Sequence, residues 1–269
     1  MTLADVLKGA VDYLTARGID TPRLDAELLI ARALGLQRIE LYTQHDRPLT
    51  EEERATLREL VRRRGAREPL AYVLGDWDFR RLTLKTDARA LVPRPETELV
   101  VERCLELLRD TAAPRIVDVG TGAGAIALAL KQERPDAQVT ATDRSTDALA
   151  LAHENAHANR LDVDLVHTDL LDGLTGPYDL VVSNPPYVGA DELATLPPEL
   201  AHEPEEALVD RGQTQRLIET AKFGWLVLEV HEARAQDVAR LLDAAGYVDV
   251  DVSQDFAGRD RIVEGRWTP

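Results

Sequence analysis

The chain has 269 residues, a formal net charge of −16, 44% apolar residues and 4% aromatic residues. At about 150 residues per domain, this length allows one large or two modest domains. The composition excludes collagen and disordered chains. The charge is uneven, because residues 1–90 carry 16 basic and 15 acidic side chains whereas residues 91–269 carry 16 and 33. Such acidity excludes a generic nucleic-acid coat.

The cysteine content and the N-terminal sequence indicate the cellular compartment in which to expect this protein. Cys104 is the single cysteine, which excludes an internal disulfide and a cysteine-cluster metal site. No apolar run approaches membrane-spanning length, and the N-terminus lacks the basic and long apolar regions of a signal peptide. His153 and His157 lie one helical turn apart without a further ligand, which favours a solvated helix face. We expect a cytoplasmic protein with no membrane contact and no metal site.

Residues 1–75 have the pattern of a small helical bundle. Apolar residues recur at helical spacing over 3–14. Thr21 and Pro22 offer an N-cap hydroxyl and a preset first residue for a second helix, and Gly35 is placed to end it. The sequence therefore predicts an N-terminal helical domain.

A further helix in this region carries a basic run. Thr50 and Glu53 form a capping box before it. Arginines follow at 62–64 and at Arg67. Such a run is usually a solvated helix face, and contact with a partner is the alternative interpretation.

The pattern changes at residues 76–92, which lose the helical period and mix apolar with turn-forming residues, as in a β-hairpin linker. From residue 115 strands and helices alternate, which predicts an α/β domain over 93–269 with a mostly parallel sheet covered on both faces. The last two strands lie close together without a helix between them, so we expect an antiparallel end. The expected strands are 115–119, 139–142, 164–167, 178–183, 225–230, 248–252 and 261–266, with helices at 125–131 and 146–158.

A glycine-rich loop joins the first strand of this domain to its helix. It consists of Gly120, Thr121, Gly122, Ala123 and Gly124. Glycines at this place let the backbone approach a ligand closely. Asp143 ends the next strand, where a carboxylate can accept hydrogen bonds from the hydroxyls of an adenosine ribose. The same glycine spacing also occurs in dinucleotide-binding dehydrogenases, so the loop alone leaves the cofactor open.

A second motif follows the strand that ends at residue 183. It reads Asn184, Pro185, Pro186, Tyr187. Two prolines stiffen the backbone, so that the Asn184 side chain and the Pro185 carbonyl can act as fixed acceptors, with Tyr187 as a flat wall. This is a receptor for a planar NH₂ group. Together with the loop, it resembles class I S-adenosylmethionine methyltransferases that act on amide or exocyclic amino nitrogens.

Three further segments narrow the resemblance. Residues 22–29, 68–75 and 92–98 are similar to marker segments of the release-factor glutamine N5-methyltransferases, the PrmC/HemK family. The resemblance implies a helical substrate-recognition domain, S-adenosylmethionine as cofactor, and methylation of the glutamine in the Gly-Gly-Gln motif of class-one peptide chain release factors. It places Asn184, Pro185, Pro186 and Tyr187 on the substrate, and Gly120, Thr121, Gly122, Ala123, Gly124, Asp143, Asp169, Leu170 and Asn184 on the cofactor.

Some positions differ from the family pattern. Arg81, His202 and His231 stand where the family usually has other residue types, and the stretch 212–232 is short.

One alternative function is an N-methyltransferase for adenine or guanine amino groups in nucleic acid, since a flipped base presents the same NH₂ geometry. The acidity of 91–269 argues against it, and we expect no stable nucleic-acid binding. A cofactor-sensing binding module without catalysis is the other alternative.

Overall fold

The computed structural model describes residues 1–189 and 191–268, which fold as two compact units. We name them the helical unit, Met1–Asp76 with Pro197–His202, and the sheet unit, Trp77–Leu196 with Glu203–Pro269. Within the described residues, no helix has the length and apolar character needed to cross a membrane.

Helix capping explains where the helices of the helical unit begin. Thr50 and Glu53 form the predicted capping box. Thr21 stands before a helix as predicted, but its backbone is not extended, and its hydroxyl donates to Asp25 Oδ1 at 2.7 Å instead of accepting a backbone N–H. The predicted hydroxyl cap is therefore wrong at Thr21. The helices are α1 (Leu3–Ala16), α2 (Pro22–Leu34), α3 (Glu40–Thr43), α4 (Glu51–Gly65) and α5 (Leu70–Leu74).

The basic run at the end of α4 is only partly a solvated face. Arg64 is buried, and its guanidinium donates to Asp25 Oδ2 at 2.7 Å and to Glu199 Oε1 at 2.9 Å. Arg67 donates to the other oxygen of Glu199 at 2.8 Å. The expectation of a solvated face is therefore wrong for Arg64. These bonds explain why Pro197–His202 belongs to the helical unit although it lies far along the chain.

The sheet unit is built on seven strands in the order β5-β4-β3-β6-β7-β9-β8. The first five in this order are parallel, and β9 runs antiparallel to β7 and to β8. This topology confirms the predicted fold class, including the antiparallel end. The strands are β3 (Arg115–Val119), β4 (Gln138–Asp143), β5 (Asp164–His167), β6 (Leu180–Ser183), β7 (Trp225–Glu229), β8 (Val248–Gln254) and β9 (Asp260–Arg266).

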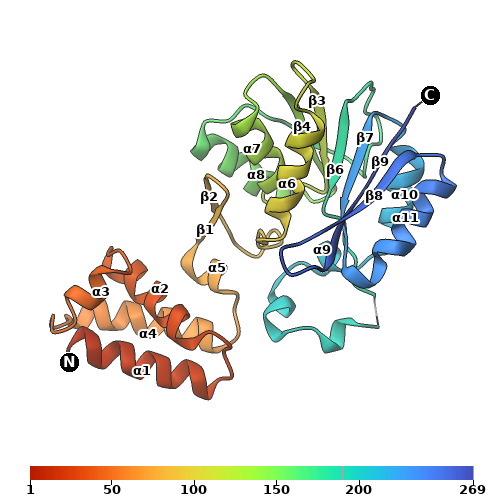
Figure 1. Ribbon diagram of the computed structural model, residues 1–269. Helices are drawn as coiled ribbons and strands as arrows, with labels where there is room; N and C mark the ends of the chain where they lie inside the picture. Colours follow the sequence, from red (N-terminus) through yellow and green to blue (C-terminus); the bar gives the residue numbers. More distant parts are fainter. Residues whose placement is uncertain (190, 269) are drawn as a thin grey trace. The chain divides into compact units, whose positions relative to one another are not determined.

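Helices cover both faces of this sheet (Figure 1). One core contains α6 (Thr97–Leu107), α7 (Ala125–Glu133) and side chains of α8 (Thr146–Asn159). The other contains α10 (Gln213–Thr220) and α11 (Ala235–Ala244). Because both faces are covered, the central strands are mostly apolar, and Leu180, Val181 and Val182 of β6 are fully buried.

The predicted hairpin consists of β1 (Asp76–Phe79) and β2 (Leu82–Lys85). Phe79, Leu82 and Leu84 are buried in the same core as α6 and α7. The hairpin is therefore packed into the sheet unit rather than exposed as a bare connection.

The connection from β6 to β7 is long and carries short helices. In chain order these are η1 (Leu193–Thr195), η2 (Pro198–His202), α9 (Glu205–Leu208) and α10, and η3 (Glu232–Arg234) follows β7. The short stretch 212–232 still forms α10, because Leu217 and Ile218 are buried against the sheet.

Candidate active site

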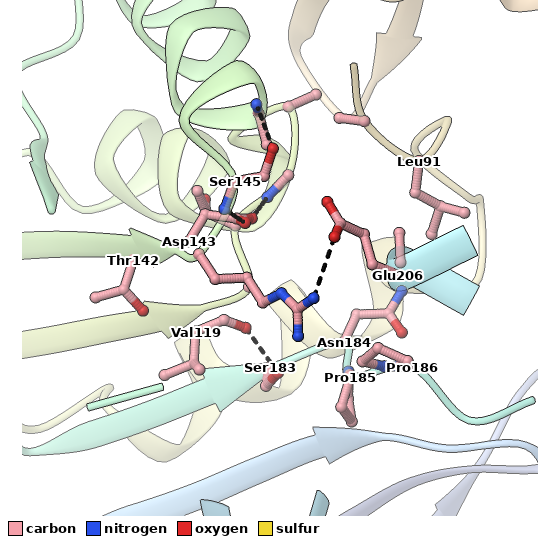
Figure 2. Close-up of a pocket in the computed structure, with 18 of the residues that line it drawn as sticks. Leu91, Val119, Thr142, Asp143, Ser145, Ser183, Asn184, Pro185, Pro186 and Glu206 are labelled. Atoms are coloured by element: carbon pink, nitrogen blue, oxygen red, sulfur yellow. Dashed lines mark hydrogen bonds and ion pairs between the residues drawn. The ribbon is translucent and has the colours of Figure 1, made fainter. Parts of the chain in front are cut away.

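A pocket lies at the carboxyl ends of the parallel strands, where an α/β sheet is expected to bind its ligands (Figure 2). Val119, Asp143 and Ser183 line it from the ends of β3, β4 and β6. Ten of the sequence-predicted site residues line the pocket, namely Gly120, Thr121, Gly122, Ala123, Asp143, Asp169, Leu170, Asn184, Pro185 and Pro186. Gly124 and Tyr187 are not among the described residues that line it.

The glycine loop is held over β4 by its own backbone. The N–H groups of Gly120 and Thr121 both donate to the Thr142 carbonyl at 2.9 Å. Gly120 and Gly122 have φ of +72° and +56°, a region that glycine adopts without a steric penalty. A Cβ built on Gly120 would meet no atom within 4 Å. The pocket side of the loop is therefore open to a ligand.

Gly124 is needed for a different reason. A Cβ at this position would lie 3.0 Å from Leu128 Cδ1 and 3.4 Å from Ala152 Cβ, and its φ is +87°. The glycine therefore lets the loop pack closely on α7 and α8, and it shapes the pocket without lining it.

Asp143 connects the end of β4 to the glycine loop. Its Oδ2 accepts the Gly122 N–H and its Oδ1 accepts the Ser145 N–H, both at 2.9 Å (Figure 2). Burial raises the pKa of the carboxyl. A carboxylate oxygen can accept more than one hydrogen bond, so both oxygens can still accept from a pair of ligand hydroxyls. This geometry suits the ribose of an adenosine cofactor.

Asp118 is not among the described residues that line the pocket, but it supports the glycine loop, and the sequence analysis did not single it out. It is buried in β3, where its Oδ2 accepts the Thr121 hydroxyl at 2.7 Å and the Ala127 N–H at 3.1 Å. Its Oδ1 has no hydrogen-bond partner among the described residues, and burial raises its pKa to about 7. The carboxyl thus joins the glycine loop to the first turn of α7. A charged residue inside an apolar strand was the available signal.

The Asn-Pro-Pro motif begins where β6 ends. The Ser183 hydroxyl donates to the Val119 carbonyl at 2.7 Å, which ties this strand end to β3 (Figure 2). Asn184 is half-buried, and its Nδ2 donates to Thr97 Oγ1 at 3.3 Å. Pro185 and Pro186 follow along the pocket wall. The motif therefore presents a fixed amide beside the glycine loop.

Tyr187 has a ring contact outside the set of described residues that line the pocket. Its ring packs on the ring of His231, with centroids 6.1 Å apart, and burial raises the pKa of its hydroxyl.

The two residues predicted to contact the cofactor after β5 both line the pocket. Asp169 accepts an N–H from Arg216 at 2.8 Å. Leu170 has a φ of +53° and lines the pocket.

The pocket rim carries two ion pairs that the sequence did not predict. Glu203 is buried, and it accepts the Val92 N–H at 3.0 Å and an Arg94 N–H at 2.5 Å. Burial raises the pKa of this carboxyl. Arg144 and Glu206 form the second pair at 3.1 Å (Figure 2). Both pairs join segments far apart in the sequence, so no local pattern indicates them.

Comparison with known proteins identifies the family of the chain. The family model described as the PrmC N-terminal domain matches residues 5–75, and the methyltransferase small domain matches residues 97–225. The release factor glutamine methyltransferase of Deinococcus radiodurans is 42% identical over 275 residues, which cover 99% of each chain.

Solved structures agree on the fold of the chain. The hMettl16 catalytic domain, in complex with the MAT2A 3′UTR hairpin 6, has a TM-score of 0.60 at 17% identity, and the match covers 76% of this chain and 82% of that one. A T. thermophilus 16S rRNA methyltransferase in complex with AdoMet and guanosine has a TM-score of 0.54 at 17% identity, with 72% and 50% covered.

The open glycine loop and the two oxygens of Asp143 fit S-adenosylmethionine, whose adenosine needs a close backbone approach and a ribose acceptor. The near-complete alignment with a relative at 42% identity settles the family. The chain belongs to the release factor glutamine methyltransferase family.

Proposed function

We propose that this protein transfers a methyl group from S-adenosylmethionine to the side-chain amide nitrogen, N5, of the glutamine in the Gly-Gly-Gln motif of class-one peptide chain release factors. The proposal rests on the family and on one observation. An amide acceptor, Asn184, lines the same pocket as the glycine loop and Asp143. A cofactor held by the loop and a substrate NH₂ held by Asn184 would therefore meet in one cavity.

The chemistry requires placement more than acid or base catalysis. An amide nitrogen is a poor nucleophile because its lone pair is delocalised into the carbonyl. When bound, S-adenosylmethionine supplies an electrophilic methyl group on a sulfonium. Asn184 Oδ1 and the Pro185 carbonyl would accept the two N–H bonds of the substrate and so aim its nitrogen. Such orientation can lower a barrier by about 7–11 kcal/mol.

The same acceptors would also stabilise the transition state. Positive charge develops on the nitrogen as its bond to the methyl group forms and the methyl–sulfur bond breaks, which would leave a neutral thioether. The hydrogens of the nitrogen become more acidic, and loss of one of them as a proton gives the neutral N-methyl amide. Fixed acceptors therefore bind the transition state more strongly than the substrate, which is the condition for catalysis. In this proposal Asn184 and Pro185 are catalytic residues, and the glycine loop with Asp143, Asp169 and Leu170 holds the cofactor.

The predicted domains would have different roles. We propose that the helical domain, residues 1–75, recognises the protein substrate, that residues 76–92 form the linker, and that residues 93–269 form the methyltransferase domain. The release factor is the proposed partner, and we propose that the reaction takes place in the cytoplasm, where translation termination occurs.

Mass spectrometry tests the proposal directly. We expect a purified class-one release factor, incubated with this protein and methyl-labelled S-adenosylmethionine, to gain one methyl group on the Gly-Gly-Gln glutamine. A release factor in which that glutamine is replaced by alanine is the control and should gain none. Label that appears only on added RNA or DNA, or no label at all, would contradict the proposal.

A further inference from the structure

A buried chain of hydrogen bonds runs from Asn184 away from the pocket. Asn184 Nδ2 donates to Thr97 Oγ1 at 3.3 Å, and the Thr97 hydroxyl donates to Glu229 Oε2 at 2.6 Å. Thr97 and Glu229 are 4% and 1% exposed. The three residues come from the end of β6, the start of α6 and the end of β7, so only the folded sheet unit brings them together.

The direction of these bonds matters because the two ends of a carboxamide differ. Its oxygen accepts hydrogen bonds, whereas its nitrogen donates them. An Asn184 amide turned by half a rotation would present NH₂ to the NH₂ of the substrate, and two donors cannot bond. An otherwise intact site would then fail to hold the glutamine nitrogen.

The chain of bonds excludes the wrong rotation. An ionised Glu229 can only accept hydrogen bonds, so the Thr97 hydroxyl must donate its single proton to the hydrogen bond with the carboxylate. Thr97 Oγ1 is then left with lone pairs alone, and only the donor end of the Asn184 amide can bond to it. The acceptor end, Oδ1, is the one that remains for the substrate.

We propose that Thr97 and Glu229 are positioning residues that hold the Asn184 amide with its oxygen toward the substrate nitrogen. The inference rests on the proposed function and adds to it the residues that orient its central acceptor. Neither residue has to touch the substrate, so the role is indirect.

Charged neighbours from several elements face Glu229. Burial is the largest influence on the pKa of Glu229 and raises it, whereas the hydrogen bond from Thr97 lowers it. Arg261 on β9 and Arg94 before α6 also lower this pKa and Glu96 raises it, and the net result is a pKa of about 7. Tyr187 from the motif also faces it, and Glu229 contributes to the raised pKa of that hydroxyl. At about pH 8 the carboxylate form that the orientation needs therefore predominates.

Removal of the Thr97 hydroxyl tests the proposal. Thr97→Val keeps the shape but breaks the chain, and we expect the single-turnover rate on a release factor to fall by about 10- to 100-fold. The Kd for S-adenosylmethionine, measured by titration calorimetry, should stay unchanged. Thr97→Ser restores the hydroxyl and should recover a rate within about threefold of wild type. Glu229→Gln, which can donate as well as accept, should also slow the reaction.

The matched control for Glu229 is Glu264, a buried carboxylate on β9 that accepts two hydrogen bonds from Arg103 at 2.6 and 2.7 Å. Glu264→Gln should alter stability but not the single-turnover rate. Circular dichroism checks folding for every variant, and Glu229→Gln together with Thr97→Ser carries the test if Thr97→Val does not fold.

A second background separates orientation from packing. A carboxylate has two equivalent oxygens, so an Asn184→Asp enzyme has no wrong rotation to exclude. We expect Thr97→Val to cost far less in the Asn184→Asp background than in wild type. An equal loss in both backgrounds would overturn the proposal, because it would mean that Thr97 acts through packing alone.

The outcomes are distinct. Wild type that does not methylate the release factor refutes the proposed function, and the inference falls with it. If wild type is active and Thr97→Val and Glu229→Gln keep the full rate, the inference is refuted and the proposed function stands. The same holds if wild type is active and Thr97→Ser is as slow as Thr97→Val.

Discussion

At the scale of single residues, Asn184 carries the largest share of the proposed chemistry. Asn184→Ala removes one acceptor for the substrate NH₂, so we expect turnover to fall by about 10²–10³. The affinity for S-adenosylmethionine should change much less. Asn184→Asp should be the milder variant, because a carboxylate still accepts hydrogen bonds. Single-turnover rates on a release factor measure the effect, and an Ala variant at near wild-type rate would reduce the motif to scaffold.

Asp143 is the residue on which cofactor affinity should depend. Asp143→Ala loses charge-assisted ribose contacts, and it also leaves the Gly122 and Ser145 N–H groups without their acceptor. We expect S-adenosylmethionine binding to weaken by about 1.5–3 kcal/mol in titration calorimetry. Unchanged affinity in Asp143→Ala would remove Asp143 from the site.

Residue identity predicted some of the site but not all of it. Asn184 and the glycines were found because short motifs coincide with strand ends. Glu229 could not be found in this way, because its role depends on Thr97, which lies 132 residues away in the chain. Tyr187 was expected at the pocket, yet its ring packs on His231. The motif indicated where the backbone turns, and the role of Tyr187 beside the substrate stays a prediction.

At the scale of elements, the glycine loop depends on backbone conformation. Gly122 has a φ of +56°, and Gly122→Val would combine backbone strain with a branched side chain at the pocket. We expect S-adenosylmethionine binding to be abolished while the helical unit remains folded. Gly173, with a φ of +76° and no atom within 4 Å of an added Cβ, is a matched control outside the pocket. Gly173→Val should carry similar strain and keep cofactor binding.

Most elements of the sheet unit were predictable because the spacing of apolar residues along the sequence indicates which side chains are buried. The run 180–182 is apolar on both faces, as a central parallel strand requires. The Thr21 cap failed because one backbone torsion pair decides whether a hydroxyl can reach an N–H. Six residues, Pro197–His202, could not be assigned to the helical unit from sequence, because the Arg64–Glu199 pair joins positions 135 residues apart.

At the scale of the whole molecule, two buried acids influence stability. Burial raises the pKa of Asp118 and of Glu229 to about 7 in each case. An acid with a raised pKa binds more protons in the folded than in the unfolded chain, so its presence lowers the unfolding free energy as pH rises from about 4 to about 7. We expect the unfolding midpoint of the sheet unit to fall over this range.

Glu229→Gln removes one of these acids, so the decline with pH should become shallower. Thermal unfolding followed by circular dichroism at about pH 5 and about pH 8 compares the two proteins. Equal slopes in wild type and variant would contradict the link to Glu229.

The segment Pro197–His202 has a consequence for how this protein can be divided. The chain passes between the two units three times, after Asp76, after Leu196 and after His202. A fragment that starts at Trp77 lacks Arg64 and Arg67, so Glu199 loses both guanidinium partners. We expect limited proteolysis to cut this fragment near 197–202 faster than the full chain, and Glu199→Ala in the full chain to reproduce the cut. Equal cutting of fragment and full chain would contradict this.

The helical unit is therefore not a detachable module. A chimera that exchanges this unit between relatives at Asp76 alone would separate Glu199 from Arg64 and Arg67, with which it pairs. A working exchange would need two grafts from the same parent, one for Met1–Asp76 and one for the six residues that follow Leu196.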